Sequence, residues 1–198
     1  SQVEPSDSRG CDGGSVVPDL YLHSGEFFLS SVDLRIPGRG LDFVWARKYR
    51  SRLGPMTAQG NGWDFSYNIR IVQEEQGVRL FDGNTRHDLY LLRSGGIYTA
   101  RQFFREGRFN PDGTFTLTFA DAGTWNFHPL DASPAAGKLA SSIDRNGNAL
   151  LLQYDGLGRL VQVTDTLNRA ITVAYDPGGH IQSVTDFGGR SVTYAYYG

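Results

Sequence analysis

The stretch from residue 137 to residue 198 reads GKLASSIDRNGNALLLQYDGL, then GRLVQVTDTLNRAITVAYDPG, then GHIQSVTDFGGRSVTYAYYG, with the units beginning at Gly137, Gly158 and Gly179. Shifting the chain along itself by 21 residues superimposes the three units. Each unit opens with glycine, a basic residue or histidine, and leucine or isoleucine. Repetition at a fixed period indicates stacked copies of one structural unit, so this stretch decides the architecture.

The second half of each unit predicts a β-strand, because its apolar columns are two residues apart and therefore share one face. These columns are Leu150, Ile171 and Val192; Leu152, Val173 and Tyr194; and Tyr154, Tyr175 and Tyr196. The apolar columns of the first half lie three residues apart, which a β-bulge would accommodate. Each unit thus predicts a β-hairpin, and stacked antiparallel hairpins would form one continuous sheet.

The rest of the chain also predicts strands and turns, with almost no helix. Tyr67, Ile69 and Ile71 alternate with polar residues, as do Phe115, Leu117 and Phe119. Asp82-Gly83-Asn84, Asp112-Gly113 and Asn146-Gly147-Asn148 predict hairpin tips, because these residues tolerate positive φ. We therefore predict an all-β protein.

Composition suggests three regions along the chain. Residues 1–15 form a flexible segment, residues 16–136 a β-rich region, and residues 137–198 the three 21-residue repeats. The small, proline-containing segment 131–137 marks the boundary before the repeats. Cys11, the only cysteine, is either an unpaired thiol or a bridge to a second copy or to further chain.

The repeat motif is specific enough to suggest a family. Tyr154-Asp155-Gly156-Leu157-Gly158-Arg159-Leu160, with Thr164-Asp165 and Tyr175-Asp176, resembles the YD repeat of bacterial Rhs proteins and of the teneurins. Upstream motifs, including Ile36-Pro37-Gly38-Arg39-Gly40 and Arg47-Lys48-Tyr49-Arg50-Ser51, resemble the region that opens the repeat tract in those bacterial proteins. The third unit departs from the pattern, with Tyr196-Tyr197 in place of Tyr-Asp. Ten residues carry the repeat: Tyr154, Asp155, Gly158, Arg159, Asp165, Tyr175, Asp176, Gly179, Asp186 and Tyr196.

The resemblance implies a spiralling β-sheet that closes into a hollow shell, of which this chain would form a part. It implies a secreted or cell-surface scaffold used for encapsulation, often of a toxin, or for surface display. One alternative is an extracellular fibre or matrix subunit that polymerises by β-strand addition. A second is a glycan-binding adhesion module, since the chain contains 12 Phe, 10 Tyr and 3 Trp.

We predict no enzymatic activity, no cofactor and no metal site. His23, His87, His128 and His180 are far apart in sequence, and no nucleophile elbow or phosphate-binding loop occurs. Asp176-Pro177-Gly178-Gly179 resembles an element near the self-cleavage site of some Rhs proteins, but it occupies the turn position of a repeat. Asp144, Asn146 and Asn148 have calcium-loop spacing, yet Ala149 stands where such a loop needs glycine.

Charge and hydropathy narrow the range of partners. The 19 basic and 21 acidic residues are scattered, so the basic stripe of a nucleic-acid-binding protein is missing. No apolar run approaches the roughly 20 residues that cross a bilayer. The expected partners are the remainder of a larger Rhs-type chain or other copies of this one, with surface glycans as a further possibility and no nucleic acid.

Overall fold

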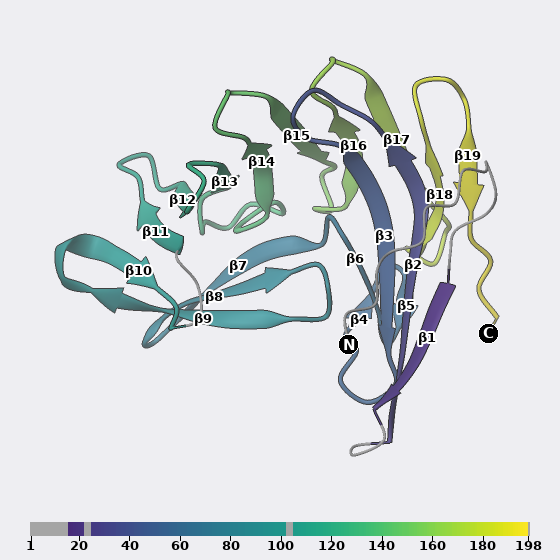
Figure 1. Cartoon of the computed structure of the whole chain (residues 1–198), viewed down its shortest axis with the longest axis horizontal. Helices are drawn as coiled ribbons and strands as arrows, with labels where there is room; N and C mark the ends of the chain where they lie inside the picture. Colours follow the sequence, from purple (N-terminus) through teal and green to yellow (C-terminus); the bar gives the residue numbers. More distant parts are fainter. Residues whose placement is uncertain (1–15, 22–24, 102–104, 198) are drawn as a thin grey trace, which may run out of the picture.

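The computed structural model describes residues 16–21, 25–101 and 105–197 and shows an all-β protein built of two main sheets (Figure 1). The only helical element among these residues is a 3-10 turn, η1 (Ser94–Gly96). Residues 1–15 and 22–24, which include Cys11 and His23, lie outside the described residues. The prediction of an all-β fold with almost no helix is confirmed.

The first sheet is antiparallel and has the strand order β1-β2-β3-β6. Its strands are β1 (Val16–Tyr21), β2 (Glu26–Ile36), β3 (Phe43–Arg50) and β6 (Trp63–Phe65). Two short strands, β4 (Met56–Thr57) and β5 (Gly60–Asn61), pair with each other in the connection between β3 and β6.

The second sheet is a 13-stranded antiparallel meander in which each strand pairs with the next along the chain. Its first seven strands are β7 (Ile69–Glu74), β8 (Gly77–Asp82), β9 (His87–Arg93), β10 (Ile97–Thr99), β11 (Arg105–Phe109), β12 (Phe115–Phe119) and β13 (Thr124–Phe127). The remaining six belong to the repeats: β14 (Leu139–Ile143), β15 (Ala149–Tyr154), β16 (Leu160–Thr164), β17 (Ala170–Tyr175), β18 (Ile181–Thr185) and β19 (Ser191–Thr193). The predicted stack of hairpins is therefore one continuous sheet.

Most of the predicted strands and turns are confirmed. Phe115 and Leu117 point into the core from β12, and the three predicted hairpin tips connect β8 to β9, β11 to β12 and β14 to β15. Tyr67 is an exception: it is buried with Ile69, but β7 begins only at Ile69. Tyr67 reaches the core from the connection after β6, because its ring stacks on Phe43 with centroids 5.1 Å apart.

The repeats also contain the predicted bulges. In the β15–β16 pair, Gln153 faces Gln162 while Tyr154 faces Leu160, so Val161 is the extra residue. The β17–β18 pair shifts in the same way, between Ala174 and Tyr175. This extra residue lets Leu160 and Val163, three positions apart, both point into the core.

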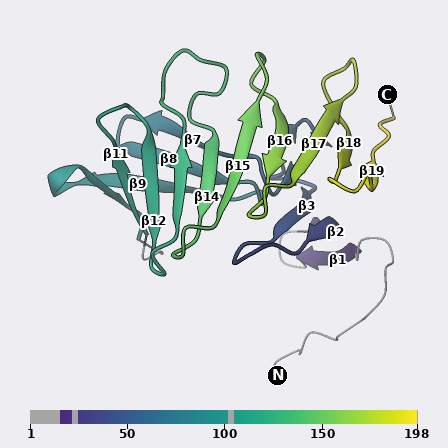
Figure 2. The ribbon, with the colours of Figure 1, turned by 90° about the horizontal axis from the view of Figure 1, so that it is seen from above.

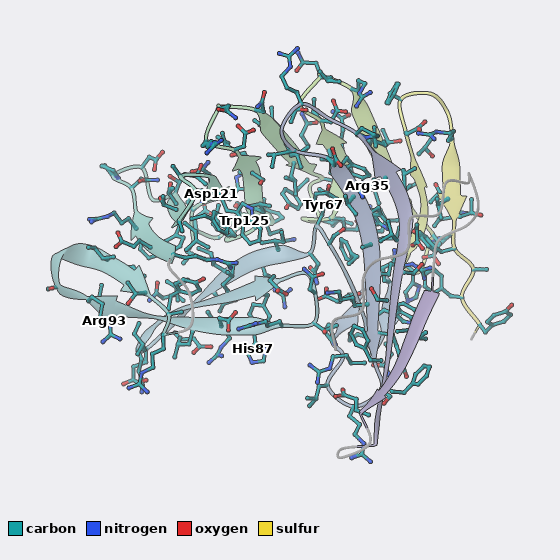
Figure 3. All side chains as sticks on the ribbon, in the orientation of Figure 1. Arg35, Tyr67, His87, Arg93, Asp121 and Trp125 are labelled. Carbon is teal, nitrogen blue, oxygen red and sulfur yellow. The ribbon has the colours of Figure 1, made fainter. Side chains whose placement is uncertain are left out.

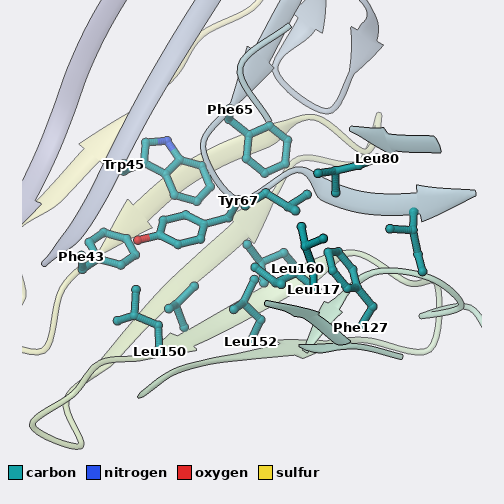
Figure 4. Close-up of a cluster of buried hydrophobic side chains, with 14 of the residues drawn as sticks. Phe43, Trp45, Phe65, Tyr67, Leu80, Leu117, Phe127, Leu150, Leu152 and Leu160 are labelled. Carbon is teal, nitrogen blue, oxygen red and sulfur yellow. The ribbon is translucent and has the colours of Figure 1, made fainter. Parts of the chain in front are cut away.

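The main core lies where the four-stranded sheet packs against the repeat strands (Figure 4). The four-stranded sheet and the segment that follows it contribute aromatic rings, and the repeats contribute aliphatic side chains. Phe43 and Trp45 of β3 are 0% exposed, as are Val163, Ile171, Ile181 and Val184 of the repeats. Burying one such side chain stabilises the fold by about 1.5–3 kcal/mol, so this contact holds the two sheets together.

The large sheet curls, so that its first strand returns to the connection that leads into the repeats (Figures 1 and 2). The N–H of Ile71 in β7 donates to the carbonyl of Gly137 at 2.7 Å, and Arg70 forms a β-bridge with Lys138. The segment 131–137 lies between β13 and β14, which pair with each other. The sheet therefore runs without a break from the upstream region into the repeats.

Candidate functional site

The repeat turns are the most regular feature of the molecule, and an aspartate opens each one. The five aspartates are Asp144, Asp155, Asp165, Asp176 and Asp186, spaced alternately 11 and 10 residues apart. In every turn the aspartate N–H donates to the carbonyl four residues later, at 2.8–3.0 Å. The fourth residue of every turn has positive φ: Gly147, Gly158, Asn168, Gly179 and Gly189. Glycine and asparagine reach this left-handed conformation at least cost, which explains their place in the repeat.

The aspartate side chain holds each turn together. In the turn at Asp165, Oδ1 accepts the N–H groups of Leu167 and Arg169, both at 2.9 Å. Its Oδ2 accepts the Arg169 guanidinium, with Nε at 2.7 Å. The Asp155 and Asp186 turns repeat this pattern with Arg159 and Arg190. The carboxylate therefore satisfies backbone donors and an arginine at once.

Two of the five turns replace arginine with another donor. Asn148 donates its side-chain N–H to Asp144 Oδ2 at 2.7 Å, and His180 Nδ1 lies 3.4 Å from Asp176 Oδ2. The segments that resembled a calcium loop and a cleavage element are thus variants of this one turn. Among the described residues, no group of three or more His, Cys, Asp or Glu could hold a metal ion.

These hydrogen bonds lower the pKa of the repeat aspartates. At Asp165 burial raises the pKa, but the hydrogen bonds from Arg169 and from backbone amides outweigh it, so the pKa falls below its usual range. The balance at Asp186 is the same. At Asp144 and Asp176 the hydrogen bonds from Asn148 and His180 are themselves the largest influence and lower the pKa. All of these carboxylates are therefore held in the charged form.

The column Tyr154, Tyr175 and Tyr196, which we call the tyrosine ladder, has a specific hydrogen-bond partner for each hydroxyl group. Tyr154, Tyr175 and Tyr196 donate to the carbonyls of Leu139, Leu160 and Ile181, at 2.8, 2.9 and 2.8 Å. Each acceptor is the first residue of the hairpin's own first strand. That carbonyl lies beyond the last backbone pair of the hairpin, so the hydroxyl satisfies a group that the ladder leaves open. Burial raises the pKa of Tyr175 to about 12.

A positively charged or imidazole side chain also packs on each of these rings. Lys138 Nζ lies 5.5 Å from the Tyr154 ring centre, and the Arg159 guanidinium lies 4.7 Å from that of Tyr175. His180 stacks on Tyr196 with ring centres 4.7 Å apart. Lys138, Arg159 and His180 occupy the same place in successive repeats, so the contact between the second residue of a unit and the tyrosine 16 residues later is itself repeated.

One rim of the repeat sheet contacts the connection between β2 and β3. The N–H of Arg39 donates to Thr166 Oγ1 at 2.6 Å, and Arg169 donates to the carbonyl of Pro37 at 2.6 Å. Gly40 approaches so closely that a Cβ there would lie 2.0 Å from Asp144 Oδ2. The upstream Pro37–Gly40 motif therefore fits onto the repeat turns.

A second contact joins the last hairpin to the four-stranded sheet. The hydroxyl of Tyr194 donates to Asp33 Oδ2 at 2.7 Å, and Arg47 forms an ion pair with the same carboxylate. The Arg47 guanidinium lies between two rings, 4.9 Å from Trp63 and 4.7 Å from Tyr194. We call Asp33, Arg47, Trp63 and Tyr194 the latch.

The sequence identified the repeat residues but not all of their partners. The structure brings Asp155 to Arg159, and each ladder tyrosine to its own unit. Sequence reasoning missed Arg169 and Arg190, although both follow an aspartate by four residues, as Arg159 does. It also missed the latch, which joins residues 161 positions apart. The described histidines are not brought together: His87 begins β9, across the molecule from the repeats, while His128 follows β13 and His180 lies in a repeat turn (Figure 3).

Comparison with known proteins agrees with this geometry. A family model described as RHS Repeat matches residues 134–170. A second, described as a domain of unknown function (DUF6531), matches residues 21–90, which include β2, β3 and the Pro37–Gly40 motif. No curated protein matches the chain. The described residues contain no helix long and apolar enough to cross a membrane. The repeat turns, the tyrosine ladder and the RHS repeat match lead to one conclusion, that residues 134–170 contain an RHS repeat and that this chain is a structural repeat protein similar to the Rhs/YD-repeat family.

Proposed function

We propose that this chain is a non-enzymatic extracellular scaffold, a part of an Rhs-type shell used for encapsulation or surface display. The observation that carries the proposal is the continuous 13-stranded meander, to which each repeat adds one hairpin. The sheet curls, and the four-stranded sheet packs on its apolar face. A curved wall that grows one hairpin at a time suits the building of a shell.

The use of the carboxylates supports a non-enzymatic role. A general acid or base near neutral pH needs a raised carboxyl pKa. The pKa values of the five repeat aspartates are instead lowered, because each carboxylate accepts hydrogen bonds within its own turn. These carboxylates stabilise the turns between the strands of the sheet.

The proposed partners are the remainder of a larger Rhs-type chain or other copies of this one, at the cell surface or in the medium, without nucleic acid or a membrane span. Glycan binding is a second alternative. It would use the groove of about 460 Å³ beside Trp63, Tyr194 and Tyr197, where rings and the amides of Gln59 and Asn61 lie together.

The size of the purified chain in solution tests the shell proposal. We expect light scattering to give a discrete particle of one or a few copies, and negative-stain images to show compact, curved objects. Filaments that lengthen with concentration would contradict the proposal and favour the fibre alternative.

The fibre alternative has one observation in its favour, which is the open edge of β19. Tyr194 N–H donates to Gln182 O at 2.9 Å, so Thr193 and Ser183 face each other as a pair that exchanges no hydrogen bonds. The Thr193 N–H therefore points away from β18. Thr193→Pro removes this outward donor and spares the β18–β19 ladder. If filaments form, their loss in this variant would show strand addition at β19, and their persistence would exclude it.

A further inference from the structure

A cavity of about 340 Å³ opens between the two sheets near the start of the repeats. One wall comes from β4 and from the chain that runs from the end of β6 to the start of β7, including Phe65, Tyr67 and Arg70. The other comes from the first two repeats, including Lys138, Tyr154 and Tyr175. A volume of this size is at the lower end of the range for small-molecule sites, which favours a compact ligand.

Two positive charges face each other at this cavity. Arg70 and Lys138 are partners in an antiparallel β-bridge, so their side chains leave the backbone on the same side, and both line the cavity. Like charges directly opposite each other on a sheet are destabilising. Burial lowers the pKa of Arg70, and burial together with Arg70 lowers that of Lys138. Lys138 packs on Tyr154 and Arg70 on Phe81, but these contacts do not require the two cations to lie opposite each other.

Neither cation forms an ion pair with a carboxylate among the described residues. The Arg70 guanidinium lies 4.1 Å from the Phe81 ring centre and 3.4 Å from Asn68 Oδ1. Lys138 Nζ donates to the carbonyl of Gly158. The third cation of the cavity, Arg159, is paired with Asp155. Asp64 attracts Arg70 and Asp155 attracts Lys138 without forming an ion pair. Both cations therefore keep donors that no carboxylate of the described residues accepts.

We propose that this cavity binds a small organic anion that carries a phosphate-type group on a compact ring. Arg70 and Lys138 would hold the anionic oxygens, because guanidinium and ammonium groups bind phosphate through charge-assisted hydrogen bonds. The rings of Phe65, Tyr67 and Tyr175 would cover the body of the ligand. This binding activity goes beyond the scaffold role and does not depend on it.

Titration calorimetry on the full chain with phenyl phosphate tests the proposal, with inorganic phosphate and phenol as comparisons. We expect phenyl phosphate to bind more tightly than either comparison, because only it offers both the anion and the ring. Equal binding of phenyl phosphate and inorganic phosphate would show an adventitious ion only. Failure of phenyl phosphate to bind would overturn the site.

Charge-removing variants locate the binding. Arg70→Gln and Lys138→Gln should each weaken phenyl phosphate binding roughly tenfold or more. Arg145→Gln, in the exposed turn between β14 and β15, is the matched control and should bind like the wild type.

Melting curves show whether a variant binds less because it has lost the site or because it has lost stability. Without ligand, Arg70→Gln should melt at or above the wild-type temperature, because it relieves the repulsion. Phenyl phosphate should raise the melting temperature of the wild type more than that of Arg70→Gln at the same ligand concentration. A ligand-free Arg70→Gln that melts well below the wild type would show that the cation is structural and contradict the proposal.

Discussion

At the scale of single residues, the repeat is defined by how each aspartate binds its own turn. The Asp165 side chain is 0% exposed and accepts two backbone N–H groups as well as the Arg169 guanidinium. A buried charge needs such partners, because an unpaired one would be strongly destabilising. The buried charge of Asp165 is therefore stable because Arg169, four residues later, donates to it.

Asp165→Asn should destabilise the protein by about 2 kcal/mol, because Asn keeps one acceptor for the backbone but loses the charge that binds Arg169. Asp176→Asn is the matched control, since its partner His180 lies 3.4 Å away and both side chains are partly exposed. It should cost less. Urea denaturation of both variants checks this, and equal losses would mean that the aspartate–arginine pair adds nothing to the turn.

Acid should unfold the protein through these same groups. The folded pKa values of the repeat aspartates lie below the unfolded value of about 3.9. Their contribution to stability is therefore complete well above that value and is lost as the pH falls through the folded pKa values. Urea midpoints should be nearly constant from pH 7 to about 5 and then fall steeply. A flat profile down to pH 3 would contradict this.

At the scale of the element, equivalent turns of successive repeats meet different surroundings. Gly158 has φ +75°, and a Cβ there would lie 2.1 Å from the carbonyl oxygen of Pro134. Gly179, at the same place in the next unit, has φ +84° and nothing within 4 Å. The same repeat glycine is thus a packing contact in one unit and only a conformational requirement in the other.

Gly158→Ala should therefore cost about 3 kcal/mol or more, since it adds a backbone clash to the strain of a left-handed alanine. Gly179→Ala should cost about 1 kcal/mol from the conformation alone. Thermal unfolding of the pair measures the difference. If the two variants melt together, then the contact between the 131–137 segment and the Gly158 turn contributes no stability.

The sequence predicted these elements well where the evidence was local. A period of two and a period of 21 were enough for the strands, the bulges and the turns, because side-chain alternation and turn chemistry act between near neighbours. The prediction that Tyr67 lies in a strand was wrong. Tyr67 shares the alternation of Ile69 and Ile71 because its ring is buried, and not because its backbone pairs with a neighbouring strand. The cavity and the latch could not be predicted, since residues such as Arg70 and Lys138 meet only when the sheet curls.

At the scale of the whole molecule, the latch is the polar contact that fixes the last hairpin to the four-stranded sheet. Burial and the hydrogen bond to Asp33 both raise the pKa of Tyr194, which therefore stays protonated and able to donate. In a repeat sheet, each unit is stabilised chiefly by its neighbours. The last described hairpin has a repeat neighbour on one side only, so the latch takes over part of this role.

Tyr194→Phe should therefore loosen one end of the sheet without unfolding the rest. It removes the hydroxyl that binds Asp33, and we expect the amides of β18 and β19 to exchange roughly tenfold faster with deuterium. Amides of β14 and β15, which lie in the interior of the sheet between β13 and β16, should keep their protection. Tyr197→Phe is the control, because the Tyr197 side chain is 99% exposed. If exchange instead accelerates equally in all repeat strands, then the sheet opens as one cooperative unit and the latch stabilises the whole wall and not its end.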